Sequence, residues 1–245
     1  MTHNEKSAEL FDHLAELRVR LVRSVIYIAI GTVTAWFFYQ SLFDLLTRPM
    51  VSVMGGIGSK FLLTSFPEAF VIQIQVCVIA GLILLSPLVT LEAWGFISPA
   101  LTRNEKRQLI WCVPLAIVLF VSGITLCYFV LPSAFQWFAS FIPKNADFKP
   151  NLQHSIRFSA LMLLAFGVMF ELPVVLMLLA KVGIVNSRML RDNWRIAIVI
   201  VSIVAAVATP SNDAFTMLTM AVPVILLYFA SILLVKVIEK KPGKA

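Results

Sequence analysis

Six long apolar segments dominate this sequence of 245 residues. A bilayer core about 30 Å thick is crossed by a helix of about 20 mostly apolar residues. Segments of that kind are 21–43, 69–92, 108–131, 157–180, 195–209 and 214–235. With 60% hydrophobic and only 13% charged residues, the chain is far more apolar than a soluble domain. The sequence therefore predicts an all-α integral membrane protein, a single membrane domain over residues 1–245 with six transmembrane helices.

The basic residues alternate along this predicted topology. The segments between and beyond the spans form two alternating sets. The set that includes both termini holds 15 of the 20 lysines and arginines, and the other set holds five. An excess of this kind marks the cytoplasmic segments of a membrane protein. We therefore expect both termini to be cytoplasmic, with 236–245 as a basic cytoplasmic tail. The net charge of +7 follows from this topology and does not indicate a nucleic-acid partner.

The segments outside the spans carry their own signals. Residues 7–20 place leucines at helical spacing among charged residues, which predicts an amphipathic helix at the membrane surface. The fifth apolar segment, 195–209, would be about 22 Å long as a helix and falls short of the bilayer core. The residues expected in structural loops or at helix starts outside the cytoplasmic face are Pro49, Pro67, Glu68, Pro210 and Asp213.

Nothing in the sequence indicates catalysis. The histidines, at positions 3, 13 and 154, all lie outside the apolar segments, and no HExxH motif is present. The three cysteines fall inside those segments without the spacing of metal ligands, which is typical of packing residues. We therefore expect no enzyme activity, no metal and no cofactor.

One carboxylate interrupts an apolar segment. Glu171 lies in AFGVMFELPVVLMLLA, and Pro173 follows it, removes a backbone donor and favours a kink that opens a polar notch. Because an ionised carboxylate is costly in lipid, Glu171 is expected to face the bundle interior, a wet cavity or a partner helix. A hydrogen bond within the bundle is the structural alternative. Two other functions stay open: a proton-coupled small-molecule transporter that uses Glu171, and a purely structural scaffold.

Two further carboxylates fall on the predicted cytoplasmic side. Glu16 precedes the first apolar segment, and Glu105 lies between the second and the third. Carboxylates in such a place can hold guanidinium groups through charge-assisted, often bidentate, hydrogen bonds. Alternatively, each is a solvated charge paired with its own neighbour, Arg20 or Lys106. Spacing alone favours this second interpretation.

Several stretches of the chain occur together and in a fixed order. They are HLAELRVRL at 13–21, PEAF at 67–70, AGLILLSPLVTLEAWGFISPAL at 80–101, NEKR at 104–107, FELP at 170–173 and ATPSNDAFTMLTMAVPVILLY at 208–228. In this combination the chain closely resembles the TatC family, the receptor core of the twin-arginine protein translocase. The resemblance implies a cytoplasmic surface that binds signal peptides with consecutive arginines. The residues carried over to that surface are Glu16, Arg18, Phe96, Pro99 and Glu105.

The resemblance also implies partners and a setting. It implies small single-span membrane proteins of the TatA and TatB type, contacted near Glu171 and Pro173, and self-association in the complex. It further implies a concave bundle in the inner membrane of a prokaryote and export of folded proteins driven by the proton-motive force. At three positions this chain carries another residue than the polar one that is usual in the family. These positions are Gln75, Met217 and Phe229. The loss at Phe229 puts a partner contact of the last span in doubt.

Overall fold

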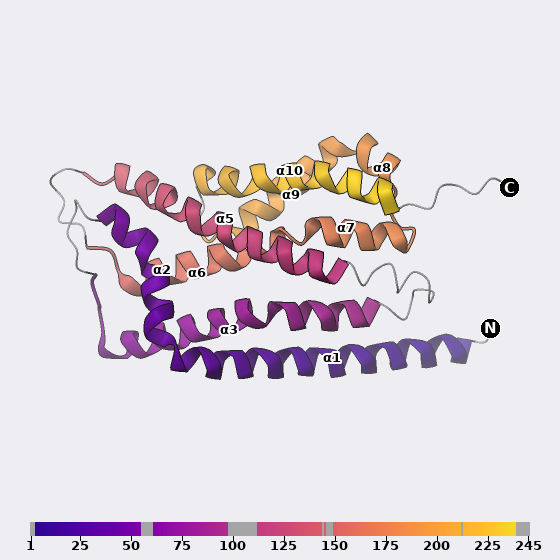
Figure 1. The fold of residues 1–245 in the computed structure, drawn as a ribbon, viewed down its shortest axis with the longest axis horizontal. Coiled ribbons are helices and arrows are strands. Elements are labelled where there is room, and N and C mark those ends of the chain that lie inside the picture. The colour runs from indigo at the N-terminus through magenta and orange to yellow at the C-terminus, as the bar shows by residue number, and fades with distance from the viewer. Residues whose placement is uncertain are drawn as a thin grey trace.

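The computed structural model describes residues 3–54, 61–97, 112–143, 145, 149–211 and 213–238, and most of them are helical (Figure 1). The helices in chain order are α1 (His3–Phe37), α2 (Tyr39–Met54), α3 (Phe66–Ile97), α5 (Cys112–Ser140), α6 (Leu152–Met169), α7 (Leu172–Lys181), α8 (Ser187–Asp192), α9 (Trp194–Ala208) and α10 (Ala214–Ile238).

Among these residues, five stretches are long and apolar enough to cross a membrane. They are Ala15–Phe37, Phe66–Glu92, Val113–Ser140, Leu152–Lys181 and Ala214–Ile238, and the apolar helix α9 is shorter. The predicted all-α, multi-span fold is confirmed. The fifth apolar segment forms α9, a helix of 15 residues.

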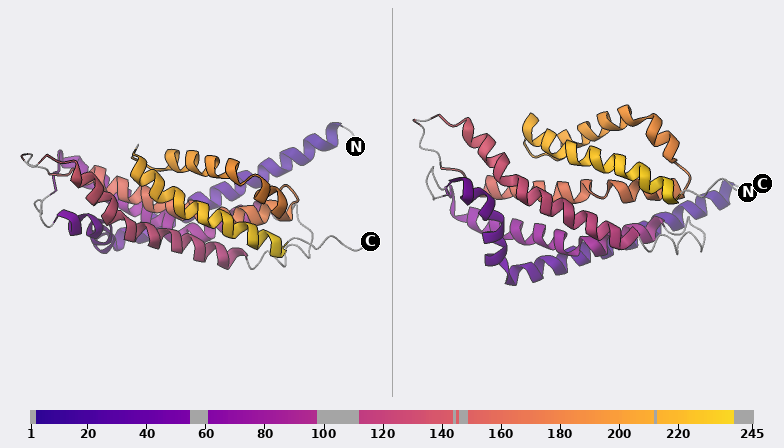
Figure 2. Two further views of the ribbon diagram at one scale, coloured as in Figure 1. Left: turned by 90° about the horizontal axis from the view of Figure 1, so that it is seen from above. Right: turned by 45° about the horizontal axis from the view of Figure 1, so that its top comes forward.

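The long helices run roughly along one direction, and α2 lies across one end of them (Figure 1). Helix α1 packs along α3, α5 packs along α6, and α10 packs against α7 and α9. Helices α5 and α6 connect the α1–α3 pair to the C-terminal helices. The start of α1 and the end of α10 lie at the same end of the bundle, here called the terminal end, in all views (Figures 1 and 2). The opposite end, crossed by α2, is called the far end.

The predicted amphipathic helix 7–20 is not separate from the first span. Helix α1 runs unbroken from His3 to Phe37, because no proline or glycine occurs before Gly31 to interrupt it. The chain then turns at Phe38 and continues into α2. Helix α1 therefore continues across the predicted boundary at residue 20, and the turn at Phe38 comes before residue 43, the predicted end of the first span.

Helix α2 occupies a connection in which Pro49 was expected to lie in a loop, and this expectation is wrong. Pro49 is buried inside α2. Leu46, Met50 and Met54, at four-residue spacing, bury one face of α2 in the main core. Proline inside a helix costs about 3 kcal/mol, and burying three large apolar side chains contributes more than that. Burial of the amphipathic face therefore outweighs the proline signal.

The fourth apolar segment forms two helices. Helix α6 ends at Met169 and α7 begins at Leu172, so the kink expected near Pro173 is a break at Phe170 and Glu171. Proline is tolerated in the first turn of α7 because the first N–H groups of a helix have no partner within it. The segment as a whole still spans 30 residues.

The other helices extend past the predicted spans. Helix α3 continues to Ile97, α5 continues through Pro132 to Ser140, and α10 continues to Ile238, so the first residues of the predicted tail are helical. Residues 108–111 and 239–245 lie outside the described residues. These extensions carry helical structure beyond the apolar stretches that marked the spans.

A pair of glycines sets the contact between α1 and α3. A Cβ added to Gly81 would lie 2.5 Å from the backbone nitrogen of Thr32, and one added to Gly31 would lie 2.9 Å from the carbonyl oxygen of Gly81. The two backbones therefore touch, as small residues allow in membrane helices. Because α1 packs chiefly on α3, this contact fixes which side chains of the two helices meet further along.

At the far end, a carboxylate joins two helices. Glu68, only 4% exposed, accepts hydrogen bonds from the backbone N–H groups of Thr64 and Ser65. The side-chain amide of Asn151, at the start of α6, donates to the other oxygen at 2.8 Å. The backbone of Leu62 also pairs with that segment. The starts of α3 and α6 are thus held together.

Candidate functional site

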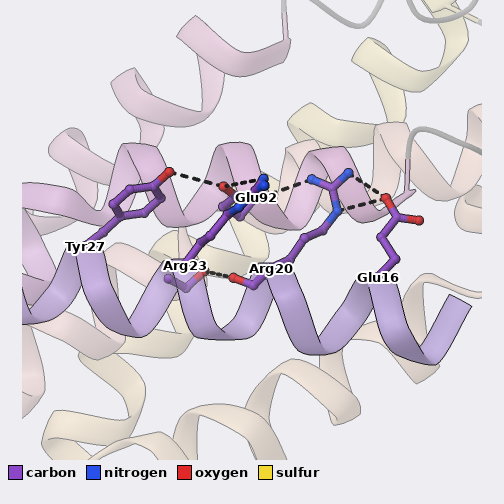
Figure 3. A network of polar contacts seen from close by, with 6 residues as sticks. Glu16, Arg20, Arg23, Tyr27 and Glu92 are labelled. Atoms are coloured by element: carbon purple, nitrogen blue, oxygen red, sulfur yellow. Dashed lines mark hydrogen bonds and ion pairs between the residues drawn. The ribbon is translucent and has the colours of Figure 1, made fainter. Parts of the chain in front are cut away.

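Near the terminal end, one face of α1 carries a row of polar side chains. Glu16, Arg20, Arg23 and Tyr27 follow each other at spacings of four, three and four residues, which places them on the side of the helix that meets α3. Figure 3 shows Arg20, Arg23 and Tyr27 reaching towards Glu92, which projects from α3, and Glu16 beside Arg20. A local repeat on α1 therefore meets a single acid from a helix distant in sequence.

Arg20 lies at the centre of this network. Its Nε and Nη2 donate to Glu16 Oε1 at 3.0 and 2.6 Å, and its Nη1 donates to Glu92 Oε2 at 3.2 Å. The Tyr27 hydroxyl donates to Glu92 Oε1 at 3.3 Å, and Arg23 Nη1 lies 3.9 Å from the same oxygen. Two carboxylates and two guanidinium groups thus form a charge-balanced cluster linking α1 to α3 (Figure 3).

The members of this cluster differ in exposure. The side chain of Glu92 is 12% exposed, that of Arg20 22%, that of Glu16 33% and that of Arg23 57%. Charge pairing is stronger where water is partly excluded than on an open surface. The Arg20–Glu92 contact is therefore the sheltered part of the cluster, and Glu16 is the carboxylate that solvent reaches more readily.

Gly95 leaves the space on α3 that the guanidinium of Arg20 occupies. A Cβ added at this position, one turn after Glu92 on α3, would lie 1.9 Å from Nη1 and 2.7 Å from Cζ of Arg20. Any larger residue would therefore push the guanidinium out of its place. The close approach of Arg20 to α3 depends on the absence of a side chain at Gly95.

The structure places only part of the predicted cytoplasmic site. Glu16 is paired with Arg20, the alternative offered by its spacing, although one of its oxygens points away from Arg20 (Figure 3). Arg18 is exposed. Phe96 lies in α3, but its side chain, and all of Pro99 and Glu105, lie outside the described residues. The meeting of Glu16 with Glu105 is thus not described.

Glu92 was missed by the sequence analysis. It lies at the end of the apolar segment 69–92 and looked like a boundary residue. The available signal was on α1, where Arg20 and Arg23 share a face with Glu16 as the only acid between residues 15 and 43. An excess of arginine facing a neighbouring helix calls for a carboxylate on that neighbour.

Glu171 lies in the break between α6 and α7 and lines a groove of about 330 Å³. The groove is formed mainly by apolar residues of α3, α6 and α7, and Ser86 and Thr90 line it on the α3 side. Oε1 of Glu171 is buried and has no hydrogen-bond partner among the described residues. The arrangement therefore leaves a polar atom inside an apolar groove. Pro173 is buried in the first turn of α7.

The remaining predicted loop residues lie at helix starts or turns. Pro67 is in the first turn of α3 beside Glu68. Pro210 lies in the turn between α9 and α10. Asp213 precedes α10, and its carboxylate accepts from the backbone N–H of Thr216 at 2.9 Å and from the Thr216 hydroxyl at 2.5 Å. These contacts are those of a helix cap, and no ligand is required to explain them.

The three unusual positions have distinct surroundings. Oε1 of Gln75 is buried in α3 without a hydrogen-bond partner among the described residues. Met217 packs against the main core, and the ring of Phe229 lies 6.4 Å from that of Trp194. Within the described part of the chain, no three His, Cys, Asp or Glu residues gather closely enough to hold a metal ion.

The family model described as Sec-independent protein translocase protein (TatC) matches residues 12–223 of this chain. The chain belongs to the TatC family. The matched range contains Glu16, Arg20, Glu92 and Glu171, so both the terminal-end cluster and the groove lie within the family domain.

Individual TatC proteins match over nearly the whole chain. The Sec-independent protein translocase protein TatC of Desulforapulum autotrophicum is 40% identical over 242 residues, which cover 98% of this chain and 89% of that protein. The TatC protein of Aquifex aeolicus is 34% identical over 235 residues, 95% of this chain and 96% of that protein. A crystal structure of the twin-arginine translocase receptor TatC matches with a TM-score of 0.79 at 34% identity, covering 92% of this chain and 98% of that one.

These matches settle the broad function. The chain is a TatC receptor component of the twin-arginine translocase, a multi-pass membrane protein and not an enzyme. The resemblance stated from its motifs is therefore confirmed. The transporter that used Glu171 as a proton site and the purely structural scaffold are both set aside.

Proposed function

We propose that the terminal end of this receptor is its cytoplasmic face and binds the twin-arginine signal peptides of folded cargo. The excess of basic residues in alternate segments supports this orientation, because both termini fall in the basic set. The membrane is then proposed to be the inner membrane of a prokaryote, since the relatives are bacterial TatC proteins. On this orientation the cluster around Arg20 lies near the cytoplasmic ends of the apolar stretch Ala15–Phe37 and of α3.

One observation carries the proposal: the carboxylates of this face already bind a guanidinium. Arg20 bridges Glu16 and Glu92 through three nitrogen atoms. A site that accepts the guanidinium of one arginine has the charge and geometry to accept that of another. Glu16 and Glu105 are proposed to hold the two arginines of the peptide.

Three neighbours are proposed to complete this surface. Arg18 lies two residues from Glu16, and Phe96 and Pro99 belong to the segment that leads from α3 towards Glu105. The apolar part of the signal peptide is proposed to follow the wall of the bundle into the membrane. Burial of that apolar surface would add to the charge pairing of the arginines.

A second contact is proposed at Glu171. Its unpartnered oxygen lies in an apolar groove, where a polar side chain from another membrane helix would supply the missing hydrogen bond. The partners are single-span proteins of the TatA and TatB type, and several copies of the receptor associate in the working complex. Transport of folded cargo then draws on the proton-motive force.

The peptide site is tested by crosslinking from the 94–107 segment. A photo-reactive residue placed there should capture a signal peptide with two arginines more efficiently than the same peptide with two lysines. Glu16→Gln and Glu105→Gln should each reduce capture of the arginine peptide more than that of the lysine peptide, because only guanidinium binds a carboxylate in a bidentate manner. The readout is crosslinked product per unit of receptor in the membrane.

Asp44→Asn provides the matched control. It removes the same charge from an exposed position on α2, at the far end. Capture of both peptides should match that of the unmodified receptor. Equal losses for the arginine and lysine peptides in the Glu16 and Glu105 variants would show general damage to the fold and would contradict the proposed site.

A further inference from the structure

We propose that Arg20 is an internal stand-in for a signal-peptide arginine: in the free receptor its guanidinium occupies Glu16, where the peptide guanidinium binds. Glu92 is the positioning residue that holds Arg20 once the peptide arginine has bound Glu16. This inference rests on the proposed function, since it requires a peptide guanidinium at Glu16. It assigns a role to Glu92, which the sequence did not single out. It also explains why a peptide-binding carboxylate is paired within the receptor itself.

The place of Arg20 is built for a planar guanidinium. One edge of the group, Nε and Nη2, faces Glu16, and the remaining nitrogen, Nη1, faces Glu92. The face of the group rests where Gly95 has no Cβ. An ordinary surface ion pair requires no such clearance from the opposite helix. Residues of α1 and α3 together therefore form the site that holds the Arg20 guanidinium.

The two carboxylates are not equivalent. Glu16 is 33% exposed and lies on the same helix as Arg20, whereas Glu92 is 12% exposed and receives a further hydrogen bond from Tyr27. A guanidinium arriving from solvent therefore meets Glu16 first. The sheltered Glu92 retains Arg20, because pairing is stronger where water is partly excluded.

The charges remain balanced when the peptide binds. In the resting state two carboxylates share one closely bound guanidinium, since Arg23 stays 3.9 Å from Glu92. When a peptide arginine binds Glu16, each carboxylate has a guanidinium of its own: the peptide's on Glu16 and Arg20 on Glu92. No carboxylate is left unpaired at any stage, which avoids the cost of stripping a partly buried charge of its partner.

The exchange also favours arginine over lysine. To displace the Nε–Nη2 edge of Arg20 from Glu16, a competitor must replace two hydrogen bonds to one oxygen. A second guanidinium can present a pair of parallel donors, whereas an ammonium is a compact point charge. A peptide with two arginines can therefore displace Arg20 from Glu16, whereas a peptide with two lysines cannot.

The test measures peptide affinity for the full-length receptor in nanodiscs by fluorescence anisotropy, with the arginine and lysine versions of one signal peptide. Arg20→Gln removes the competitor and should tighten binding of the arginine peptide about fivefold. Arg48→Gln is the charge-matched control at an exposed position on α2, at the far end, and should change affinity by less than about twofold, because it lies away from the cluster around Arg20. Weaker binding by Arg20→Gln, or equal gains from the two variants, would overturn the stand-in role.

The role of Glu92 is tested by a double-mutant cycle. Glu92→Gln leaves Arg20 to Glu16 alone and should weaken arginine-peptide binding about threefold. Glu92→Asp, which keeps a carboxylate, should restore most of the affinity. In the Arg20→Gln background, Glu92→Gln should have no effect, because Glu92 acts through Arg20. An equal loss in both backgrounds would show that Glu92 binds the peptide directly and would overturn its positioning role.

One further variant separates this inference from the proposed function. Glu16→Gln should abolish the preference for the arginine peptide. If the preference survives, the proposed peptide site fails and the stand-in fails with it. If the preference is lost while Arg20→Gln gives no gain, the proposed function stands and only the stand-in is rejected. Arg20→Lys, which keeps the charge but loses the planar fork, should fall between wild type and Arg20→Gln.

Discussion

Glu68 and Glu171 both stand at the start of a helix, yet the protein treats their carboxylates in opposite ways. Glu68 is nearly fully buried and accepts two backbone N–H groups and the amide of Asn151. Glu171 opens α7 without a side-chain cap, and its buried Oε1 has no partner among the described residues. A buried polar atom costs stability unless it is hydrogen-bonded. The comparison separates an acid that holds the fold together from one that the fold leaves available to a partner.

The local sequence explains the difference. Residues 61–65, before α3, are not helical, and Ser65 with Glu68 follows the S-x-x-E pattern in which the acid bonds back to the start of its own helix. Before Glu171 the chain is already helical, and Glu171 itself has helical angles of −73° and −8°. The first turn of α7 contains Pro173, which has no N–H, and the side chain of Glu171 makes no capping hydrogen bond there. Glu171 therefore does not repeat the backbone contacts of Glu68.

The largest effect is expected from Glu68→Ala. The change removes the acceptor of three hydrogen bonds, which join the start of α3 to the residues before it and to Asn151, so the melting temperature of the purified receptor should fall by several degrees. Glu68→Gln should fall less, because it keeps one carbonyl acceptor. A melting temperature unchanged in Glu68→Ala would show that this carboxylate does not hold α3 to α6.

A smaller effect on stability, with a loss of function, is expected from Glu171→Ala. Because its Oε1 makes no hydrogen bond within the described chain, removing the carboxylate should leave the melting temperature within about 2 °C of wild type. Copurification of a single-span partner should drop, while binding of an arginine signal peptide stays intact. Full recovery of the partner would count against a contact in the groove.

Hydropathy alone could predict the helices that cross the membrane, because apolar length is what a bilayer requires. It could not predict α2, whose apolar residues are spread over one face, nor the break at Glu171, which depends on where α6 stops. Pro49 was expected in a loop or at a helix start, and Pro132 directly follows the predicted span 108–131, yet both lie inside helices. Proline marks a boundary only where packing does not already hold the helix together.

The site was harder to predict than the fold. Glu16 was identified from its position before the first span, and Glu171 from the cost of placing a carboxylate in an apolar segment. The role of Glu92 becomes visible only when α1 is packed against α3, because its partner Arg20 lies on α1. That register is set by the contact between Gly31 and Gly81, more than one turn of helix away from the charges. No local pattern contains this information. Sequence reasoning therefore identified the carboxylates that stand alone and missed the one that depends on a neighbouring helix.

Asp213 offers a third helix-start acid, and the smallest expected effect. Burial raises the pKa of its carboxyl group, but hydrogen bonds from Ser211, Thr216 and Phe215 outweigh burial and hold the pKa below the usual value. A group whose pKa is lowered by folding stabilises the native state above its unfolded pKa, and this stabilisation is lost as the pH falls through the folded pKa. Asp213 should therefore resemble Glu68 and not Glu171, with a weaker contribution because it is less buried.

The variant Asp213→Asn makes this resemblance measurable. At pH 7 it should melt one or two degrees below wild type, since the charged acceptor of the Thr216 N–H and hydroxyl is lost. The difference should shrink as the pH is lowered below about 4, where the wild-type carboxylate becomes protonated as well. Asp44→Asn, at an exposed site, corrects for the change in net charge. A difference that stays constant across this pH range would mean that Asp213 contributes by its shape and not by its charge, and the division between structural and available acids would then rest on Glu68 and Glu171 alone.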